Sequence, residues 1–257
     1  MVTLKSAREM DAMARAGDIL GRTLARLRAM VRPGISTEDL DAEAEAFIRS
    51  HKGARPSFKG LYGFPKTLCV SIDEEIVHGI PSSTRVLEEG SIISIDCGVL
   101  LEGLHADSAT TVPVGRISPE AQRLLDVTSR CLDAGLAAAV VGNHIGDIGH
   151  AVQTHAESFG YSVVKDFVGH GIGTSLHEEP QVPNYGPAGR RERLVAGMCL
   201  AIEPMVNVGR PEVEMLADGW TAVTRDRSLS AHFEHTVAVT ASEPWILTAR
   251  AVPVHAR

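Results

Sequence analysis

The stretch FVGHGIGTSLHEEPQVPNY, residues Phe167–Tyr185, is the one around which the rest of the chain is organised. It places His170 between two glycines, and His177 follows seven residues later, directly before Glu-Glu-Pro. Glycines beside a histidine let the backbone approach a bound ion or substrate closely, because no Cβ intervenes. A single Gly-His-Gly is a weak signal, since loops contain many glycines. Its meaning therefore depends on the remaining sequence.

Length and composition predict an ordinary globular protein. The chain has 257 residues, of which 44% are hydrophobic and 22% are charged, enough for one large domain or two small ones. No linker-like or low-complexity stretch divides it, so we predict a single catalytic domain over 1–257. The formal net charge of -7 argues against a broad electrostatic grip on nucleic acid.

The sequence favours a cytoplasmic protein without membrane contact. The first 17 residues contain no apolar core of a signal peptide. No stretch approaches the ~20 apolar residues that span a bilayer. The four cysteines lie far apart without a Cys-x-x-Cys pair, which is typical of reduced thiols in a cytoplasm.

Hydrophobic periodicity predicts an α+β chain whose elements occur in the same order twice. Each half starts with two helices and continues with short strands that carry a histidine and two acids. We interpret this as an internal duplication, with halves of about 1–116 and 117–240. The expected helices cover 6–31, 36–51, 118–141 and 145–159, and the expected strands cover 67–72, 76–77, 91–97, 106–114, 162–168, 198–202, 220–223 and 232–239.

Four carboxylates, Asp96, Asp107, Glu203 and Glu234, are expected at the ends or edges of apolar strands. Asp96 alone reads best as a turn residue, because aspartate near glycine is common in turns. Glu203 is different, because the following proline favours an extended backbone. Buried carboxylates are rare unless they are paired or bound to a cation.

If these acids converge with His170, their charge needs compensation. Four carboxylates carry -4, which two divalent cations would balance. Oxygen-rich ligands with one imidazole suit Mn²⁺, Fe²⁺, Co²⁺ or Zn²⁺. Carboxylates that bridge two such ions are typical of hydrolases that activate a water as the nucleophile.

Further short motifs follow one another along nearly the whole chain. They are YGFPKTLCVS at Tyr62–Ser71, VHGIP at Val77–Pro81, the strands of Asp96 and Asp107, GHGIG at Gly169–Gly173, HEEPQV at His177–Val182, AIEP at Ala201–Pro204, Gly219-Trp220 and FEHT at Phe233–Thr236. In their order and spacing, the chain resembles the type I methionine aminopeptidases in their short bacterial form. The short distance between Glu203 and Glu234 suits type I, since type II enzymes carry an inserted subdomain there.

The resemblance implies the pita-bread fold, in which helices cover a curved antiparallel sheet with internal pseudo-twofold symmetry. It implies excision of the initiator methionine from nascent proteins, with a small second residue preferred, by a hydroxide held between two metal ions. Glu203 would also shuttle the proton, His177 would stabilise the oxyanion and His78 would contact the substrate amide. The implied metal ligands are Asp96, Asp107, His170, Glu203 and Glu234, and the implied methionine pocket consists of Tyr62, Phe64, Cys69 and Trp220.

The chain departs from the usual pattern of this family at three positions. Leu176 stands where many relatives have phenylalanine, which affects the shape of the pocket. Asp73 stands where asparagine is common, close to a monovalent cation site in relatives. His105-Ala106 precedes Asp107, where relatives often have a glycine next to the aspartate, and we interpret His105 as a surface histidine.

Two other functions remain open from the sequence. One is an Xaa-Pro aminopeptidase or dipeptidase on the same fold, although those relatives usually carry an additional N-terminal domain. The other is a pseudoenzyme that serves as a binding module, although such proteins should have lost ligands. The sequence does not identify the metal used in the cell. Nothing in it requires more than a monomer, and local basic spots could serve transient ribosome contact.

Overall fold

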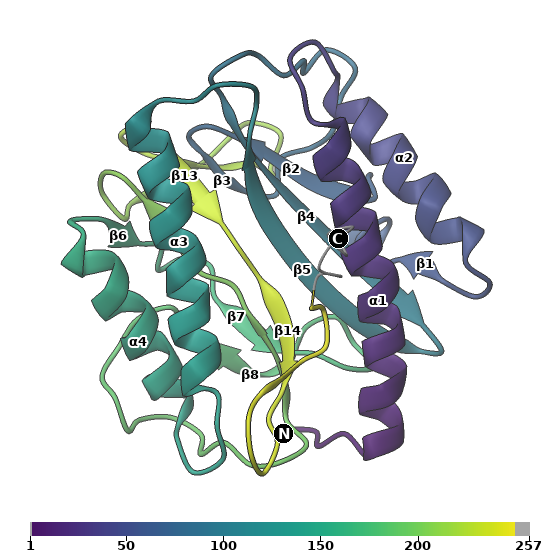
Figure 1. Ribbon diagram of the computed structural model, residues 1–257, viewed down its shortest axis with the longest axis vertical. Coiled ribbons are helices and arrows are strands. Elements are labelled where there is room, and N and C mark those ends of the chain that lie inside the picture. Colours follow the sequence, from purple (N-terminus) through teal and green to yellow (C-terminus); the bar gives the residue numbers. More distant parts are fainter. Residues whose placement is uncertain (1, 250–257) are drawn as a thin grey trace, which may run out of the picture.

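The computed structural model describes residues 2–249, in which two pairs of helices flank a layer of antiparallel strands (Figure 1). The pair α1 and α2 lies on the right of the view, beside the strands β1 (Arg55–Pro56), β2 (Leu68–Ile72), β4 (Ile92–Leu101) and β5 (Leu104–Pro113). The pair α3 and α4 lies on the opposite side. The helices are α1 (Ala7–Met30), α2 (Thr37–Ser50), α3 (Pro119–Ala138) and α4 (Ile145–Ser158).

The helix starts follow from capping residues that are visible in the sequence. The hydroxyls of Ser6, Ser36 and Ser118 each accept a hydrogen bond from the backbone N–H three residues later. Glu9 and Asp39 complete capping boxes at the first two of these helices. All four predicted helices are confirmed within three residues at each end.

The strands pair in four hydrogen-bonded sheets within the described residues, and every pairing is antiparallel. The first sheet contains β1, β2, β4 and β5, and the largest has the order β15-β14-β9-β7-β8. A short 3₁₀ helix covers Leu61–Gly63. The strands are β1 (Arg55–Pro56), β2 (Leu68–Ile72), β3 (Glu75–Val77), β4 (Ile92–Leu101), β5 (Leu104–Pro113), β6 (Ser162–Val163), β7 (Gly169–Gly171), β8 (Glu178–Val182), β9 (Cys199–Ile202), β10 (Met205–Asn207), β11 (Val213–Met215), β12 (Ala222–Thr224), β13 (Ser230–His232), β14 (His235–Ala238) and β15 (Trp245–Ile246).

Strands β4 and β5 are longer than the sequence predicted, so Asp96 and Asp107 lie inside strands rather than at their ends. The turn interpretation of Asp96 was therefore wrong. Gly98 lies within β4, where there is no room for a side chain. A Cβ there would lie 2.7 Å from the Cβ of Ser57 and 2.9 Å from the ring of Phe58. This glycine serves the close approach of a neighbouring segment and not a turn.

Two other predicted strands differ from the structure. The stretch 232–239 is interrupted at Phe233 and Glu234, which separates β13 from β14. The stretch 162–168 contains only the two-residue β6. In both places charged residues interrupt the apolar run, Glu234 in the first stretch and Lys165 with Asp166 in the second.

Each helix pair packs its apolar face on its own set of strands. Leu20 and Leu24 of α1 lie in one buried cluster with Ile93 and Ile95 of β4. Residues of α3 and α4 form another with β9, β10, β13 and β14. This arrangement fits the expected α+β class, while the internal duplication with halves 1–116 and 117–240 stays a prediction.

Side-chain hydroxyls join β5 to the segment that contains β13 and β14. The backbone N–H of Asp107 donates to the hydroxyl of Thr236 at 2.9 Å, and that hydroxyl donates to the carbonyl of Asp107 at 2.8 Å. Ser108 donates to the carbonyl of Glu234 at 2.6 Å. These bonds, together with a backbone bond from Glu234 to Ala109, bring the two halves of the fold together.

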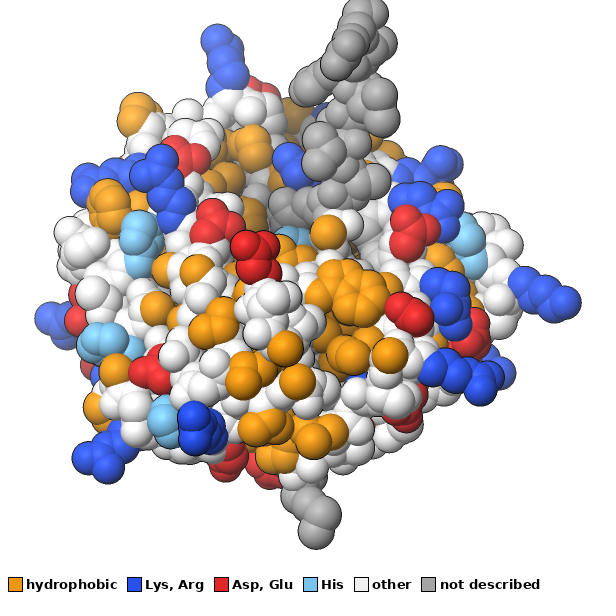
Figure 2. All heavy atoms as spheres, turned by 60° about the horizontal axis from the view of Figure 1, so that its bottom comes forward, with side chains coloured by type: hydrophobic (Ala, Val, Ile, Leu, Met, Phe, Trp, Pro, Cys, Tyr) orange, Lys and Arg blue, Asp and Glu red, His pale blue; other side chains and the backbone are white. Residues whose placement is uncertain are grey.

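The charged side chains and the cysteines lie as expected for a globular protein with mixed surface charge and reduced thiols. Figure 2 shows the lower face of the molecule, where Lys and Arg side chains lie around the rim, separated by acidic and apolar side chains. All four cysteines are buried and free. None of the helices in residues 2–249 is long and apolar enough to cross a bilayer.

Candidate metal and substrate site

The register of β4 and β5 brings Asp96 and Asp107 to one face of the first sheet. Asp96 lies opposite Ala109, and Asp107 lies opposite Gly98. Residues two apart on a strand point to the same face. The two aspartates are therefore diagonal neighbours on one face, a distance that side chains of this size can bridge.

A comparable diagonal arrangement occurs between β7 and the end of β9. His170 of β7 lies opposite Ala201 of β9, and Glu203 follows two positions after Ala201. His170 and Glu203 are therefore also diagonal neighbours, and His170 Nε2 lies 3.6 Å from Glu203 Oε1. The β9–β14 register, continued by one position beyond Ile202 and His235, places Glu234 opposite Glu203.

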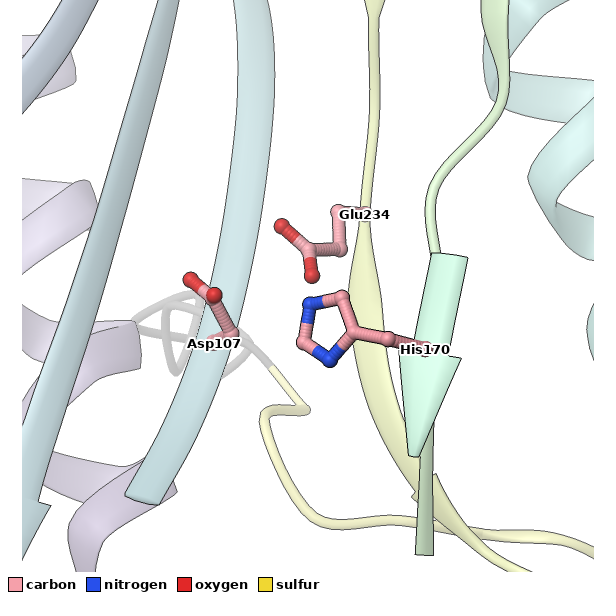
Figure 3. A group of neighbouring side chains, drawn as sticks. All are labelled: Asp107, His170 and Glu234. Atoms are coloured by element: carbon pink, nitrogen blue, oxygen red, sulfur yellow. The ribbon is translucent and has the colours of Figure 1, made fainter. Parts of the chain in front are cut away.

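These five predicted ligands all line one cavity. Ligand atoms of Asp107, His170 and Glu234 lie within 4.8 Å of one another, and Figure 3 shows the three side chains converging from three strands or strand ends. Asp96 and Glu203 adjoin this group from neighbouring strands. The structure thus brings together all five residues, which are spread over more than half of the sequence.

The four carboxyl groups lie in an environment that disfavours their charge. Burial raises the pKa of Asp96 to about 7, although hydrogen bonds with the Cys97 backbone and Asp107 oppose this. Burial, and then the charges of neighbouring acids, raise the pKa values of Asp107, Glu203 and Glu234 well above the ordinary range. The acids of this cluster therefore repel one another unless cations or protons compensate them.

The environment of His170 keeps one ring nitrogen bare. Its Nδ1 lies 2.8 Å from the carbonyl oxygen of Gly171, to which it can only donate. This bond fixes the tautomer with Nε2 unprotonated, as in metal-ligating histidines whose other nitrogen is held by a carbonyl. Burial and the neighbouring His177 lower the pKa of His170 to about 4, so the ring is neutral near pH 7.

The residues present fit a divalent metal site. Asp96 Oδ1, Asp107 Oδ1 and Glu234 Oε1 are buried without a hydrogen-bond partner. Orphaned buried oxygens of this kind are rare in folded proteins and need a partner. The described residues that line the cavity include neither lysine nor arginine. Carboxylate oxygens and one imidazole nitrogen are suitable ligands for such cations.

An apolar pocket adjoins the acids within the same cavity, which has a volume of about 130 Å³. The rings of Phe64 and Trp220 meet edge to face, with centroids 5.1 Å apart. Leu176, which departs from the family pattern, is buried in the wall. The predicted pocket residues Tyr62, Phe64, Cys69 and Trp220 all line the cavity, together with Phe58 and Leu61, which the sequence analysis missed.

His177 and His78 lie where the apolar pocket meets a second, larger cavity, which both residues also line. The ring of His177 stacks on Tyr62 with centroids 5.9 Å apart and meets the ring of His170 edge to face at 4.5 Å. His78 has a left-handed backbone with φ of 62° and packs against Phe167. Such backbone strain is often found at functional sites.

His232 is a further polar residue at the site that the sequence analysis did not select. It is 2% exposed and lines the second cavity, and its Nε2 lies 3.8 Å from Glu203 Oε2 without a hydrogen-bond partner. Burial lowers its pKa to about 3. Its place inside an apolar strand run gave no signal, because buried histidines in such runs are usually structural.

Two residues that depart from the family pattern have defined partners. Asp73 accepts hydrogen bonds from the hydroxyl of Ser91 and the backbone N–H of Ile92, both at 2.9 Å. Its carboxylate is thus engaged within the protein. His105 is half-buried rather than on the surface, and its Nδ1 lies 2.9 Å from the hydroxyl of Ser57. The surface interpretation of His105 was therefore wrong.

Comparison with known proteins assigns the chain to a family. Residues 11–241 match the model of metallopeptidase family M24. The chain is 53% identical over 248 residues to a methionine aminopeptidase of Clostridium perfringens, covering 96% of this chain and 99% of the relative. The crystal structure of methionine aminopeptidase from Thermotoga maritima superposes with a TM-score of 0.95 at 40% identity, covering 96% and 99% of the two chains.

A more distant structure shares the fold only. The prolidase of Pyrococcus horikoshii superposes with a TM-score of 0.77 at 20% identity, and the match covers 98% of this chain but 65% of the prolidase. The expected pita-bread fold is confirmed by these neighbours. With near-complete coverage in both directions and about half of all positions identical, the chain belongs to the methionine aminopeptidases of metallopeptidase family M24.

Proposed function

We propose that this enzyme removes the N-terminal methionine from peptides and nascent proteins, with a small second residue preferred. The observation that carries the proposal is the single cavity in which an apolar pocket adjoins five converging ligand groups. A peptide that places its first side chain in the pocket has its first amide beside the acids. This geometry supports cleavage after the first residue.

Asp96, Asp107, His170, Glu203 and Glu234 would hold the metal. Two divalent ions would balance the four carboxylates, and Co²⁺, Mn²⁺, Fe²⁺ and Zn²⁺ all suit the donor set. When bound, such ions polarise a carbonyl and lower the pKa of water, which makes a nucleophile available at neutral pH. The remaining tasks belong to side chains of the protein.

In our proposal Glu203 moves the proton. Its Oε1 faces His170 and its Oε2 faces His232, so the carboxylate spans the boundary between the ligand cluster and the second cavity. Burial and the charge of Asp96 raise its pKa well above the ordinary value. A carboxylate with a raised pKa can accept a proton from the attacking water and return it to the leaving amine.

His177 and His78 would act on the peptide bond itself. Burial lowers the pKa values of both histidines, so each ring is neutral near pH 7 and still carries one N–H. In our proposal His177 donates to the scissile carbonyl oxygen as negative charge develops there. His78 holds the amide of the second residue and orients the leaving group.

The apolar pocket would select methionine. Phe58, Phe64 and Leu176 are almost fully buried, and together with Trp220 they surround a narrow space. The unbranched thioether of methionine adapts well to an irregular wall of aromatic and aliphatic groups. Cys69 contributes a thiol to the same wall.

A cleavage assay on Met-Ala peptides tests this proposal. We expect Glu203→Gln and His170→Ala to abolish release of methionine, and we expect metal-free protein to recover activity when each divalent cation is restored in turn. Asp41→Asn is a matched control, because Asp41 is buried in the first half and accepts hydrogen bonds from Thr67 and Leu68. Full activity of either site variant would refute the assignment of roles.

The same assay separates the alternative substrate class. An Xaa-Pro peptidase on this fold would cleave Ala-Pro peptides in preference to Met-Ala peptides. A non-catalytic binding module would cleave neither substrate and would bind no divalent ion at micromolar concentration. The match covers 99% of a methionine aminopeptidase but only 65% of a prolidase, which supports the proposed methionine aminopeptidase activity.

We further propose that the enzyme acts on nascent chains in the cytoplasm as a monomer, in transient contact with the ribosome. Sedimentation of the purified protein would measure its mass, and co-sedimentation with ribosomes at low and high salt would measure that contact. A stable dimer would contradict the monomeric state. The absence of any salt-sensitive association would contradict the ribosome contact.

A further inference from the structure

A buried ion pair ties the N-terminal segment to the loop that carries His177. The side chain of Lys5 is 3% exposed, and its Nζ lies 2.5 Å from Glu178 Oε2. The same ammonium donates to the carbonyl of Thr3 at 3.1 Å, and the backbone N–H of Lys5 donates to Gly197 at 2.7 Å. Lysine is almost never buried to this extent unless it is paired.

The second oxygen of Glu178 organises the loop that precedes it. Glu178 Oε1 accepts a hydrogen bond from the backbone N–H of Ser175 at 3.2 Å and from the hydroxyl of Thr174 at 3.3 Å. One carboxylate therefore connects Lys5 to both sides of the turn 174–178. This turn carries Leu176, a wall of the apolar pocket, and His177.

The last glycine of the GHGIG motif is explained by the same pair. A Cβ at Gly173 would lie 2.3 Å from Cε of Lys5 and 2.7 Å from Oε1 of Glu178, far closer than atoms approach without a shift. A side chain at position 173 would therefore displace the ends of the Lys5 and Glu178 side chains, and glycine leaves the ion pair undisturbed. The contact shows that the motif serves the ion pair as well as the ligand His170.

Few side-chain contacts hold the imidazole ring of His177, so its position depends mainly on the backbone of the turn 174–178. Within residues 2–249 its ring makes no hydrogen bond, and its aromatic contacts are the stacking on Tyr62 and the edge contact with His170. Tyr62 is itself 74% exposed, so its stacking supplies only part of the restraint on the ring. The direction of the imidazole is thus set mainly by the turn that Glu178 holds.

We propose that Lys5, acting through Glu178, is a positioning residue that holds His177 and Leu176 at the active site. This inference rests on the proposed role of His177. Loss of the pair would let the turn 174–178 move relative to the pocket, and displacements of about 1 Å can cost on the order of 100-fold in rate.

A double-mutant cycle tests the proposal in the full-length, metal-loaded enzyme. We expect Lys5→Met to lower kcat for a Met-Ala peptide by about tenfold or more, and to change kcat less than twofold in a His177→Ala background. Arg15→Met is the control, because it removes the exposed Arg15–Glu102 ion pair from the same N-terminal part of the chain. We expect this control to leave kcat unchanged.

Glu178→Gln provides a second variant in case Lys5→Met does not fold, since glutamine keeps the shape and one acceptor oxygen. We expect it to lower kcat several-fold and to speed amide hydrogen exchange of the backbone N–H of Ser175. Lys5→Arg should restore part of the rate, because it restores the charge.

The outcomes distinguish this inference from the proposed function. If Glu178→Gln keeps kcat within twofold of wild type, or if the loss is equally large in the His177→Ala background, the positioning role is refuted. If His177→Ala itself has full activity, the role of His177 in the proposed function fails. In that case the exchange of the Ser175 amide still reports whether the pair holds the turn.

Discussion

Asp107→Asn should stabilise the metal-free protein and weaken its response to metal. Asp107 is 4% exposed, and its Oδ1 has no hydrogen-bond partner. A ligand oxygen of Glu234 lies within 4.8 Å of one of Asp107. Two unit charges at this separation repel each other by about 3.5 kcal/mol at an effective dielectric constant of about 20. Substitution by asparagine removes that repulsion while it keeps the shape of the side chain.

Bound protons reduce this gain, because burial and neighbouring charges raise the pKa values of both carboxyls. We therefore expect the metal-free variant to be more stable than wild type by about 1–3 kcal/mol. For a domain of this size, this raises Tm by roughly 3–10 °C. The order of stability should reverse at a metal concentration of about 1,000 times the wild-type Kd, where binding stabilises the wild type by about 4.1 kcal/mol.

Thermal unfolding with and without added Mn²⁺ or Co²⁺ measures both effects. Asp41→Asn is the matched control, since Asp41 accepts two backbone hydrogen bonds and does not line the cavity. It should keep the full metal-induced rise in Tm. The reasoning would be refuted if Asp107→Asn were less stable than wild type without metal and still gained as much stability from metal.

Three further predictions concern the pocket, the neighbouring ring and acid stability. Trp220→Ala should raise KM for Met-Ala peptides about tenfold and change kcat little, because the pocket loses an apolar wall; an unchanged KM would contradict this. Tyr62→Phe should keep kcat while Tyr62→Ala lowers it several-fold, since only the ring stacks on His177; equal rates would exclude a role for stacking. Burial alone would raise the pKa of Glu178, but hydrogen bonds from Lys5 and the loop lower it. Its contribution to stability should therefore be present above pH 4.5 and disappear as pH falls through the lowered pKa, so urea unfolding of wild type and Glu178→Gln should converge in acid.

The helices were predictable because their signals are local. Ser6, Ser36 and Ser118 are capping residues that precede amphipathic runs, and each helix begins directly after its serine. Short-range signals of this kind do not depend on how the rest of the chain folds. The sequence therefore predicted all four helices with boundaries close to those observed.

The strands were less predictable because their limits depend on neighbours. Gly98 looked like the end of a strand, but its missing side chain makes room for Ser57 and Phe58, which lie about 40 residues earlier. Strand β8 was missed because Glu178–Val182 contains two acids and a proline, which are poor strand formers. Partners that are distant in sequence decide both cases.

The candidate site was identified mainly by its similarity to a family, and the structure adds the reason for its convergence. Asp96 and His170 were plausible ligands from their residue types, but only strand register shows that each has a diagonal acidic neighbour. His232 and Lys5 gave no signal, since one lies in an apolar run and the other looks like a solvated terminal residue. Their surroundings are formed by segments more than 25 residues away.

The hydroxyl groups between β5 and the segment 230–238 have a consequence for the proposed metal site. Asp107 lies on β5 and Glu234 lies between β13 and β14, and Ser108 and Thr236 bridge the two segments. A methyl or hydrogen in place of either hydroxyl would change the separation of the two carboxylates without altering a proposed ligand. In the proposed site, preference among cations of different radius would then depend on residues that never touch them.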